Sequence, residues 1–303
     1  MTQQNVRRMK WSFDLPLDDL QRRTAQQVLR EAGAPFDPDA PDFSDHVRRV
    51  WGLYQAQLVR LSTRRLDHRV DRALFQRKHE EYIDNVHESA DERENLIQGL
   101  DKVNRAVLAY RWFYRALEHF VRQMPGDECS VLDIGSGHGA FAIRLARRKR
   151  MGGKRVRVVG SDLNPDYVQR AQEEAEARGV DIEFKVLDAL ALHTLPERFD
   201  VITSTQTIHH FQPAMLARVI ASAQRNARHG VVFLDARRSP LTLLGAMVGT
   251  SVLGRDRKLV HDGVVSVRRM YSPAELEMLA ACAPGGERLR ATNLAYAYVV
   301  LAG

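Results

Sequence analysis

The stretch "VLDIGSGHGAF", residues 131–141, decides how this chain is expected to fold. An apolar run leads into three glycines, Gly135, Gly137 and Gly139, and an amphipathic segment follows them. Glycine lets the backbone take left-handed conformations and approach a ligand closely, and a helix that starts there presents unbonded N–H groups. The stretch therefore predicts a strand, a nucleotide-binding loop and a helix. Because "GSGHGA" also fits the dinucleotide fingerprint, whose last position accepts alanine, the glycines alone leave the nucleotide open.

After this loop, short apolar runs alternate with amphipathic segments. We predict strands over residues 129–135, 155–163, 180–188, 199–205 and 229–236, and helices over residues 138–150, 165–179, 213–227 and 272–283. Strands that alternate with helices indicate an α/β fold with a doubly wound, mainly parallel sheet. The apolar runs 287–293 and 295–303 have almost nothing between them, so they must pair as a terminal antiparallel hairpin and complete seven strands.

Residues 1–128 have a different, helical texture. "PLDDLQRRTAQQVLREAG" has an acidic first turn and a glycine stop at Gly33. Residues 44–66 place apolar side chains at helical spacing, and residues 94–124 form a long helical pattern with a break expected near Gly99. We therefore predict a helical N-terminal extension over residues 1–128 that acts as a lid over the substrate pocket, and a nucleotide-binding domain over residues 129–303.

The chain is basic, with 45 Lys+Arg against 38 Asp+Glu and a formal net charge of +7. The excess lies after residue 128, and much of it is one run, "RLARRKRMGGKRVR", residues 144–157. This run ends the first predicted helix and begins the second strand, opposite the nucleotide crevice of such a sheet. We expect a solvated helix end, and nucleic acid is not favoured as a partner.

Two cysteines, Cys129 and Cys282, have neither disulfide-framework nor metal-site spacing. No apolar run reaches about 18 residues, so no membrane span is expected, and the first residues lack the apolar core of a secretory signal. We expect a cytoplasmic protein, and we leave a homodimer open.

Three acidic residues stand at the ends of three successive predicted strands. Asp133 lies within the first predicted strand, just before the glycines, where a dinucleotide fold usually has an apolar residue. Asp162 ends the second strand, where a carboxylate can accept both ribose hydroxyls, and Asp188 ends the third, where it can accept an adenine amino group. The carboxyl ends of the strands in an open α/β sheet meet at one crevice, so the three acids form a specific set.

With this set the sequence resembles the class I S-adenosylmethionine-dependent methyltransferases, over roughly residues 129–303. The resemblance implies a Rossmann-like methyltransferase fold and S-adenosyl-L-methionine as the cofactor. It also implies that the glycine loop wraps the methionine and ribose part, while the next strand ends hold ribose and adenine. The residues assigned to the cofactor in this way are Asp133, Gly135, Ser136, Gly137, Asp162, Leu163, Asp188, Ala189 and Thr205.

The segments "LDKVNRAVLAYRWF", "LDARRSPLTLLGAMV" and "HDGVVSVRRMYSPAELEMLA" resemble a narrower group, the bacterial small-molecule methyltransferases linked to quinone, phenolic and polyketide biosynthesis. This resemblance adds Asn104 and Arg111 to the cofactor contacts. Arg111 would pair with the cofactor carboxylate, since a guanidinium can bind a carboxylate through two hydrogen bonds. A solvated helix arginine is the alternative for Arg111.

His209 and His210 follow the fourth predicted strand, where the resemblance implies that the reactive methyl group lies. A histidine there can act as a general base toward a hydroxyl or an acidic carbon, because it exchanges its proton near neutral pH. It can equally be a wall or hydrogen-bonding residue of the pocket. A metal site is disfavoured because no third ligand accompanies the pair, and we predict none. We favour His209 as the pocket-facing ring because similar family members often carry a histidine or a large residue there.

The same segment reads "STQT" where enzymes that methylate adenine or glutamine amide nitrogen carry an Asn/Asp-Pro-Pro-aromatic motif, which argues against those acceptors. Arg237, Arg238 and Tyr271 are the further substrate contacts that we predict. The sequence thus predicts S-adenosylmethionine-dependent methyl transfer to a small-molecule acceptor, a phenolic, polyketide or quinone-like compound methylated on oxygen or carbon. The alternatives are an RNA or protein methyltransferase, a non-catalytic cofactor-binding partner protein, and a dinucleotide oxidoreductase.

Overall fold

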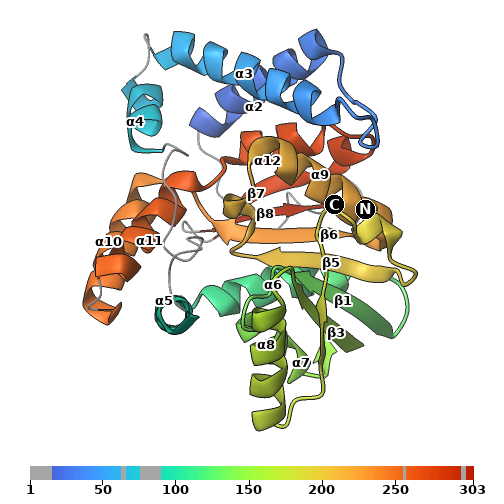
Figure 1. Ribbon diagram of the computed structural model, residues 1–303. Helices are drawn as coiled ribbons and strands as arrows, with labels where there is room; N and C mark the ends of the chain where they lie inside the picture. Colours follow the sequence, from blue (N-terminus) through green and yellow to red (C-terminus); the bar gives the residue numbers. More distant parts are fainter. Residues whose placement is uncertain (1–15, 63–65, 76–89, 255–256, 295–297) are drawn as a thin grey trace.

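The computed structural model describes residues 16–62, 66–75, 90–254, 257–294 and 298–303, and its centre is one twisted sheet (Figure 1). The strands are β1 (Glu128–Ile134), β2 (Arg150–Met151), β3 (Lys154–Asp162), β4 (Glu183–Val186), β5 (Phe199–Thr205), β6 (Ala227–Ala236), β7 (Arg290–Leu294) and β8 (Tyr298–Ala302). They lie in the order β2-β3-β1-β5-β6-β8-β7, and β4 pairs with β3 outside this path.

The pairing confirms the predicted doubly wound sheet. β1 is parallel to β3 and β5, β3 to β4, and β5 to β6, while β8 is antiparallel to both β6 and β7. The strand that the sequence does not predict is β2, which pairs antiparallel with β3. Gly152 and Gly153 reverse the chain there with φ angles of 59° and 91°. The residues around them are mostly basic, so the sequence lacks the apolar pattern that predicts a strand.

Helices cover both faces of the sheet (Figure 1). The helices α9 (Pro213–Asn226) and α12 (Pro273–Ala280) lie on one face, and α6 (Ala109–Val121), α7 (Ala140–Ala146) and α8 (Pro165–Ala177) lie on the other. Successive side chains of a strand point to opposite faces, so in β1 Val131 joins one buried core and Leu132 the other. Both faces are buried, as is usual for a parallel sheet wound by helices.

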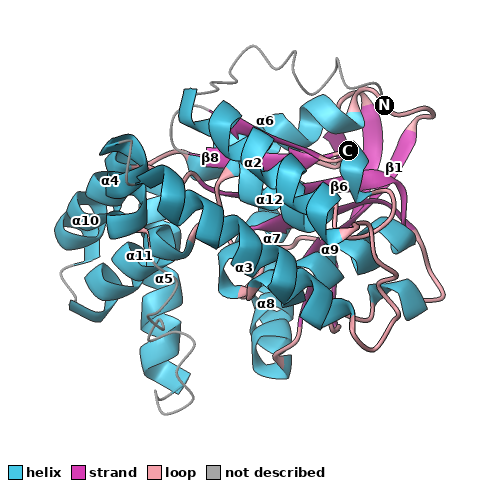
Figure 2. Cartoon of the chain, turned by 90° about the horizontal axis from the view of Figure 1, so that it is seen from above, coloured by secondary structure: helices cyan, strands magenta, loops and turns pink. Residues whose placement is uncertain are grey.

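The helices that precede the sheet pack against different parts of the molecule. α2 (Pro16–Ala32) packs on α12, and α3 (Phe43–Ser62) packs on α9. Both therefore add a second layer of helices over the face of the sheet that α9 and α12 cover. α4 (Leu66–Leu74) follows α3. α5 (Ala90–Ala106) instead packs against α10 (Pro240–Gly254) and α11 (Arg257–Arg269) at one end of the molecule (Figure 2). The predicted lid also included residues 1–15 and 76–89, which lie outside the described residues.

The break in the long helical pattern is at Leu108, so the predicted break near Gly99 is wrong. α5 continues through Gly99 and ends at Ala106, and Leu108 takes a left-handed φ of 56° before α6 begins. A Cβ at Gly99 would lie 2.7 Å from Leu259 Cδ2 of α11. This glycine therefore serves the close approach of two helices rather than a chain break.

α10 and α11 form a helical hairpin that the sequence patterns do not resolve. Over its 15 residues α10 has no charged side chain. The two helices approach closely at Gly263, where a Cβ would lie 2.6 Å from Thr250 Cγ2. No helix in the described ranges, α10 included, is long and apolar enough to cross a membrane.

Candidate active site

A cavity of about 520 Å³ opens at the carboxyl ends of the parallel strands β1, β3, β5 and β6. The glycine loop and Asp162 line one side of it, and α5, α10, α11 and the turn after β5 line the others. In an open α/β sheet this crevice is the usual ligand position. The volume falls within the roughly 300–1,000 Å³ of small-molecule sites.

The glycine loop is held in place by backbone contacts to β3 and to the turn after β5. The Ser136 N–H donates to Ser161 O at 2.8 Å, and the Ser136 hydroxyl donates to Asp133 O at 2.9 Å. Gly135 has a φ of 65°, and a Cβ there would lie 2.5 Å from Thr207 Cγ2. Only glycine fits this position, as the sequence motif predicts.

Asp162 connects the end of β3 to the glycine loop. Its Oδ2 accepts the Gly137 N–H at 2.9 Å, and its Oδ1 accepts the Asn164 N–H at 3.0 Å. The half-buried carboxylate also lines the cavity. Each oxygen retains a further acceptor site, so the group can receive ligand hydroxyls while it holds the loop.

Asp133 lies beneath the loop and is 1% exposed. Neither carboxyl oxygen has a hydrogen-bond partner among the described residues. Burial raises the pKa of Asp133 well above its ordinary value, and the neighbouring Asp162 raises it further. A buried polar group without a partner calls for an explanation such as a ligand or water that satisfies it.

His209 forms a buried pair with Asp235, which ends β6. The His209 Nδ1 lies 2.9 Å from Asp235 Oδ2, and the backbone N–H of His209 donates to the same oxygen at 3.2 Å. The other oxygen, Oδ1, accepts the Ala236 N–H at 2.8 Å. The tautomer that donates from Nδ1 to the Asp235 carboxylate leaves Nε2, which is buried, as the acceptor nitrogen of the ring.

Both histidine rings line the cavity, with their centroids 4.2 Å apart. His209 is 4% exposed, whereas His210 is half-buried. Arg269 of α11 donates to His210 O at 3.0 Å, which ties this turn to the helical hairpin. Both predicted histidines therefore line the cavity. The two rings differ in that His209 pairs with Asp235.

The wall from α5 carries a second polar group. Asn104 Nδ2 donates to Gln206 Oε1 at 2.5 Å, and Gln206 has a left-handed φ of 54°. Tyr110 of α6 donates to Asp101 Oδ1 at 2.7 Å. Burial raises the pKa of Tyr110, and the Asp101 carboxylate raises it further. These contacts connect the helical segment before the sheet to the strand ends that form the site.

The structure brings only part of the predicted cofactor set to the cavity. The lining includes Asn104, Gly135, Ser136, Gly137, Asp162 and Thr205. It does not include Asp133, which is buried beneath the loop, Arg111, which is exposed on α6, or Leu163, which is 67% exposed. Asp188 is exposed and accepts the Leu190 N–H at 2.8 Å, and Ala189 packs at the edge of one core.

The three predicted substrate contacts also lie outside the lining. Arg238 is buried between Asp71 of α4 and Glu275 of α12, with closest contacts of 2.6 and 2.9 Å. Burial alone lowers the pKa of Arg238, but the Glu275 and Asp71 carboxylates raise it above its ordinary value. Arg237 is 6% exposed, and Tyr271 is 2% exposed and donates to Phe211 O at 2.7 Å.

Sequence reasoning missed several residues of this site. They are Asp101, Tyr110, His138, Gln206, Thr207, Asp235 and the residues from α10 and α11. Asp235 had the clearest signal, because "VVFLDA" ends the fifth strand in an acid as the first three strands do. The others depend on helices whose packing the patterns do not reveal.

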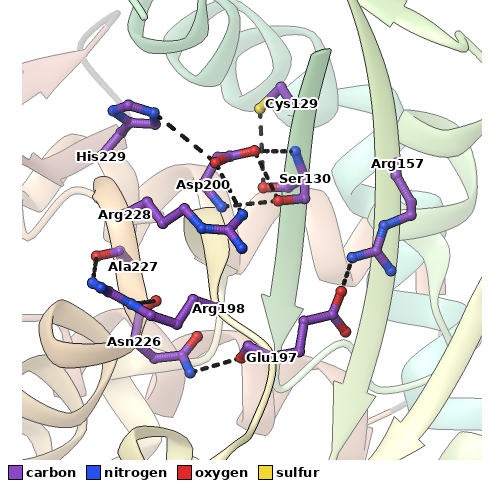
Figure 3. Close-up of polar contacts among 10 residues, drawn as sticks. All are labelled: Cys129, Ser130, Arg157, Glu197, Arg198, Asp200, Asn226, Ala227, Arg228 and His229. Atoms are coloured by element: carbon purple, nitrogen blue, oxygen red, sulfur yellow. Dashed lines mark hydrogen bonds and ion pairs between the residues drawn. The ribbon is translucent and has the colours of Figure 1, made fainter.

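The opposite end of the sheet carries a separate polar network (Figure 3). Asp200 Oδ2 accepts the N–H and the hydroxyl of Ser130, each at 2.8 Å, and Arg228 lies 3.3 Å from Oδ1. Burial raises the pKa of Asp200, but these bonds outweigh it and hold the pKa below its ordinary value. Arg157 of the basic run pairs here with Glu197, away from the cavity. Arg144 of the same run lies nearer to the cavity, because its Nη2 is 3.8 Å from Oδ1 of Asp101, which lines the cavity.

Within the described ranges, no three His, Cys, Asp or Glu side chains gather in a way that could hold a metal ion. Neither cysteine forms a disulfide bond within the described residues, and both are buried.

Residues 131–230 match the model of a family described as a methyltransferase domain. The ubiquinone biosynthesis O-methyltransferase of Pseudomonas entomophila (strain L48) is 29% identical over 149 residues, which are 48% of this chain and 60% of that protein. Its counterpart from Brucella anthropi is 29% identical over 166 residues, 54% of this chain and 62% of that protein. The chain thus spans about three fifths of the length of these curated relatives.

Two solved structures are similar to parts of this chain. A plantazolicin methyltransferase in complex with S-adenosylhomocysteine is 13% identical, with a TM-score of 0.49 over 63% of this chain and 69% of that one. Magnesium protoporphyrin IX methyltransferase from Synechocystis PCC 6803 is 17% identical, with a TM-score of 0.42 over 73% of this chain and 90% of that one.

Proposed function

We propose that this chain, which carries a methyltransferase domain of the class I, S-adenosylmethionine-dependent type, transfers a methyl group from S-adenosylmethionine to a small-molecule acceptor. The acceptor that we propose is a phenolic, polyketide or quinone-like compound, methylated on oxygen or carbon. The observation that carries the proposal is the His209–Asp235 pair, whose histidine lines the same cavity as the glycine loop. The names of the ubiquinone-pathway relatives favour a phenolic acceptor.

The residues of the cavity fit this cofactor. A Cβ added at Gly137 would meet nothing within 4 Å, so there is open space beside the loop. Asp162 lines that space and would hold the ribose hydroxyls, and the buried Asp133, which is outside the lining, would support the loop from below. When bound, the cofactor supplies an electrophilic methyl group on a sulfonium. The chain contributes orientation and proximity, which can account for much of the rate of such a displacement.

His209 would act on the acceptor. Asp235 holds the Nδ1–H, so Nε2 can take the proton of an acceptor hydroxyl as the oxygen becomes a nucleophile. The Asp235 carboxylate then stabilises the imidazolium, as the acid of a Ser-His-Asp triad does. His210 would shape the acceptor side of the cavity. A carbon acceptor would use the same base if its C–H is acidic.

A direct test is the product. The protein is incubated with methyl-labelled S-adenosylmethionine and a panel of catechols, quinols and polyketide phenols, and product mass and methyl position are determined. A singly methylated product supports the proposal. Calorimetric binding of NAD, with no binding of S-adenosylmethionine or S-adenosylhomocysteine, would overturn it in favour of an oxidoreductase.

Substitution of Asp162 by alanine should weaken S-adenosylhomocysteine binding by about 1–3 kcal/mol, because buried ribose hydrogen bonds are lost. The loss of the Gly137 and Asn164 contacts adds to the effect by loosening the loop. Isothermal titration calorimetry measures the affinity. Asp181→Ala, at an exposed position before β4, is the control and should bind as the wild type does. Equal affinities for both variants would count against the assigned role of Asp162.

We further propose a cytoplasmic location, which the two unbonded cysteines support because cytoplasmic thiols stay reduced. The basic residues of the polar network around Asp200 do not favour a nucleic-acid acceptor, because Arg157, Arg198 and Arg228 are not among the residues that line the cavity. A homodimer is a further expectation, and sedimentation equilibrium measures it.

A further inference from the structure

The chain between α11 and α12 meets the site in two different ways. Met270 lines the cavity, whereas its neighbours Arg269 and Tyr271 are outside the lining. Both neighbours are nevertheless buried. Their side chains therefore do not face a ligand in the cavity, and any part that they play in the reaction has to pass through the residues that they contact.

These two side chains hold consecutive carbonyl groups of the turn that follows β5. Arg269 Nη2 donates to His210 O at 3.0 Å, and the Tyr271 hydroxyl donates to Phe211 O at 2.7 Å. The turn is the short helical element η3 (Ile208–His210), and Phe211 directly follows it. The end of a helix leaves its last carbonyls without partners inside the helix, and a buried carbonyl without a partner is costly. The two donors therefore fix the end of the turn at two successive residues.

The beginning of the turn is held by β6. The Gln206 N–H donates to Leu234 O at 2.8 Å, and the N–H and Nδ1 of His209 both contact Asp235 Oδ2. His209 thus lies between contacts from β6 and contacts from the α11–α12 segment. The first set orients its ring, and the second fixes the backbone immediately after it. A shift at the end of the turn would move the ring relative to the cavity.

Tyr271 is itself held by neighbours from two other helices. Trp51 of α3 meets its ring edge-on, with the centroids 5.9 Å apart and the planes at 82°. The next residue, Ser272, caps α12 through reciprocal hydrogen bonds with Glu275 of 2.8 and 3.3 Å. Among the described residues, none from α2, α3 or α4 lines the cavity. α3 therefore reaches the site only indirectly, and Tyr271 is a point where it does so.

We propose that Arg269 and Tyr271 are positioning residues, which hold the turn after β5 so that the His209 ring keeps its place in the wall of the cavity. The inference rests on the proposed function, in which His209 takes a proton from the acceptor. The rate of such a step depends steeply on geometry, and a displacement of about 1 Å can cost about 10²-fold. Tyr271 then acts through the turn rather than on the substrate, which is the role that the sequence predicts for it.

The test removes the Tyr271 hydroxyl alone, by Tyr271→Phe in the wild type and in His209→Gln. Single-turnover methylation of the best acceptor from the panel of catechols, quinols and polyketide phenols gives the rate, and calorimetry gives the affinity for S-adenosylhomocysteine. We expect Tyr271→Phe to lower the rate of the wild type about tenfold with unchanged cofactor affinity, because the turn loses a contact that holds it. In His209→Gln the same change should leave the rate unaltered, since the group that it positions is gone.

Arg269 provides a second arm of the test. Arg269→Met should lower the rate in the same direction, whereas Arg269→Lys should retain more of it, because an ammonium can also donate to His210 O. Tyr54→Phe is the matched control, since Tyr54 is a buried tyrosine of α3 that also lies beside Trp51. It should retain the wild-type rate. A loss as large as that of Tyr271→Phe would indicate a general loosening of the core and would contradict the inference.

A further readout does not depend on turnover. The ¹⁵N chemical shifts of the His209 ring, assigned by their loss in His209→Gln, report its contact with Asp235. They should change in Tyr271→Phe and stay as in the wild type in Tyr54→Phe. Unchanged ring shifts in Tyr271→Phe, or an equal loss of rate with and without His209, would rule out the positioning role. Changed ring shifts in a protein that methylates no acceptor would support that role for the turn and sink the proposed function alone.

Discussion

Replacement of His209 by glutamine is expected to lower kcat by about 10²–10⁴-fold, the usual contribution of a positioned general base. The affinity for S-adenosylhomocysteine should stay unchanged, because the residues assigned to the cofactor are other than His209. Glutamine fills much of the same volume but cannot accept a proton at neutral pH. Single-turnover rates and calorimetry on the same preparations separate the two effects.

The matched control is His229→Gln, at an exposed histidine in the network opposite the cavity, which should retain wild-type turnover. Asp235→Asn should lower kcat in the same direction, since an amide can stabilise the wrong tautomer of the ring and cannot stabilise the imidazolium. Wild-type turnover of His209→Gln at every pH would leave His209 as a wall residue.

Replacement of Arg238 by methionine is expected to lower the free energy of unfolding by about 3–5 kcal/mol, the usual cost of breaking a buried ion pair from one side. Arg238 donates twice to Asp71 and twice to Glu275, and the three side chains are largely buried. Without the guanidinium, two carboxylates remain unpaired in the interior. Urea unfolding followed by circular dichroism measures the change.

Arg225→Met provides the comparison, because Arg225 pairs with Asp39 at 2.8 Å on the surface. That exposed pair should contribute no more than about 1 kcal/mol. Adding Asp71→Leu to Arg238→Met should restore part of the lost stability, since it removes one unpaired carboxylate. Equal destabilisation by Arg238→Met and Arg225→Met would show that the buried cluster contributes no more to the free energy of unfolding than the exposed pair does. The cluster joins α4 and α12 to the segment after β6, and therefore supports the strand end that carries Asp235.

The sheet could be predicted because the apolar residues of each strand indicate by themselves that the strand is buried. Residues 199–205 form β5 at the predicted bounds, and β1 and β3 differ from prediction by one residue at each end. Strand and helix periods are local properties of the sequence. The glycine loop could also be predicted from the sequence. Gly135 has a positive φ and lies against Thr207, so no other residue fits there and the position has to be a glycine.

The walls of the site could not be predicted in the same way. Asn104 and Arg111 look like neighbours on one long helix, but the left-handed turn at Leu108 ends α5 and resets the helical phase. Arg111 then falls on the exposed side of α6, opposite the buried Phe113. α10 is apolar on every side, so periodicity does not indicate which face meets the cavity. The pairing of His209 with Asp235 depends on how far β6 extends beyond β5, which no local pattern reports.

The contacts that hold the glycine loop have a consequence for binding kinetics. Asp162, Ser161 and Thr207 hold the loop in its left-handed conformation through hydrogen bonds within the protein. A nucleotide therefore does not have to order these residues, and the entropic penalty that accompanies the folding of a flexible loop is absent. Association at this end of the cavity should approach the rate of a rigid site. The slow steps should then belong to the other side of the cavity, which α5 and the α10–α11 hairpin line from two distant parts of the chain.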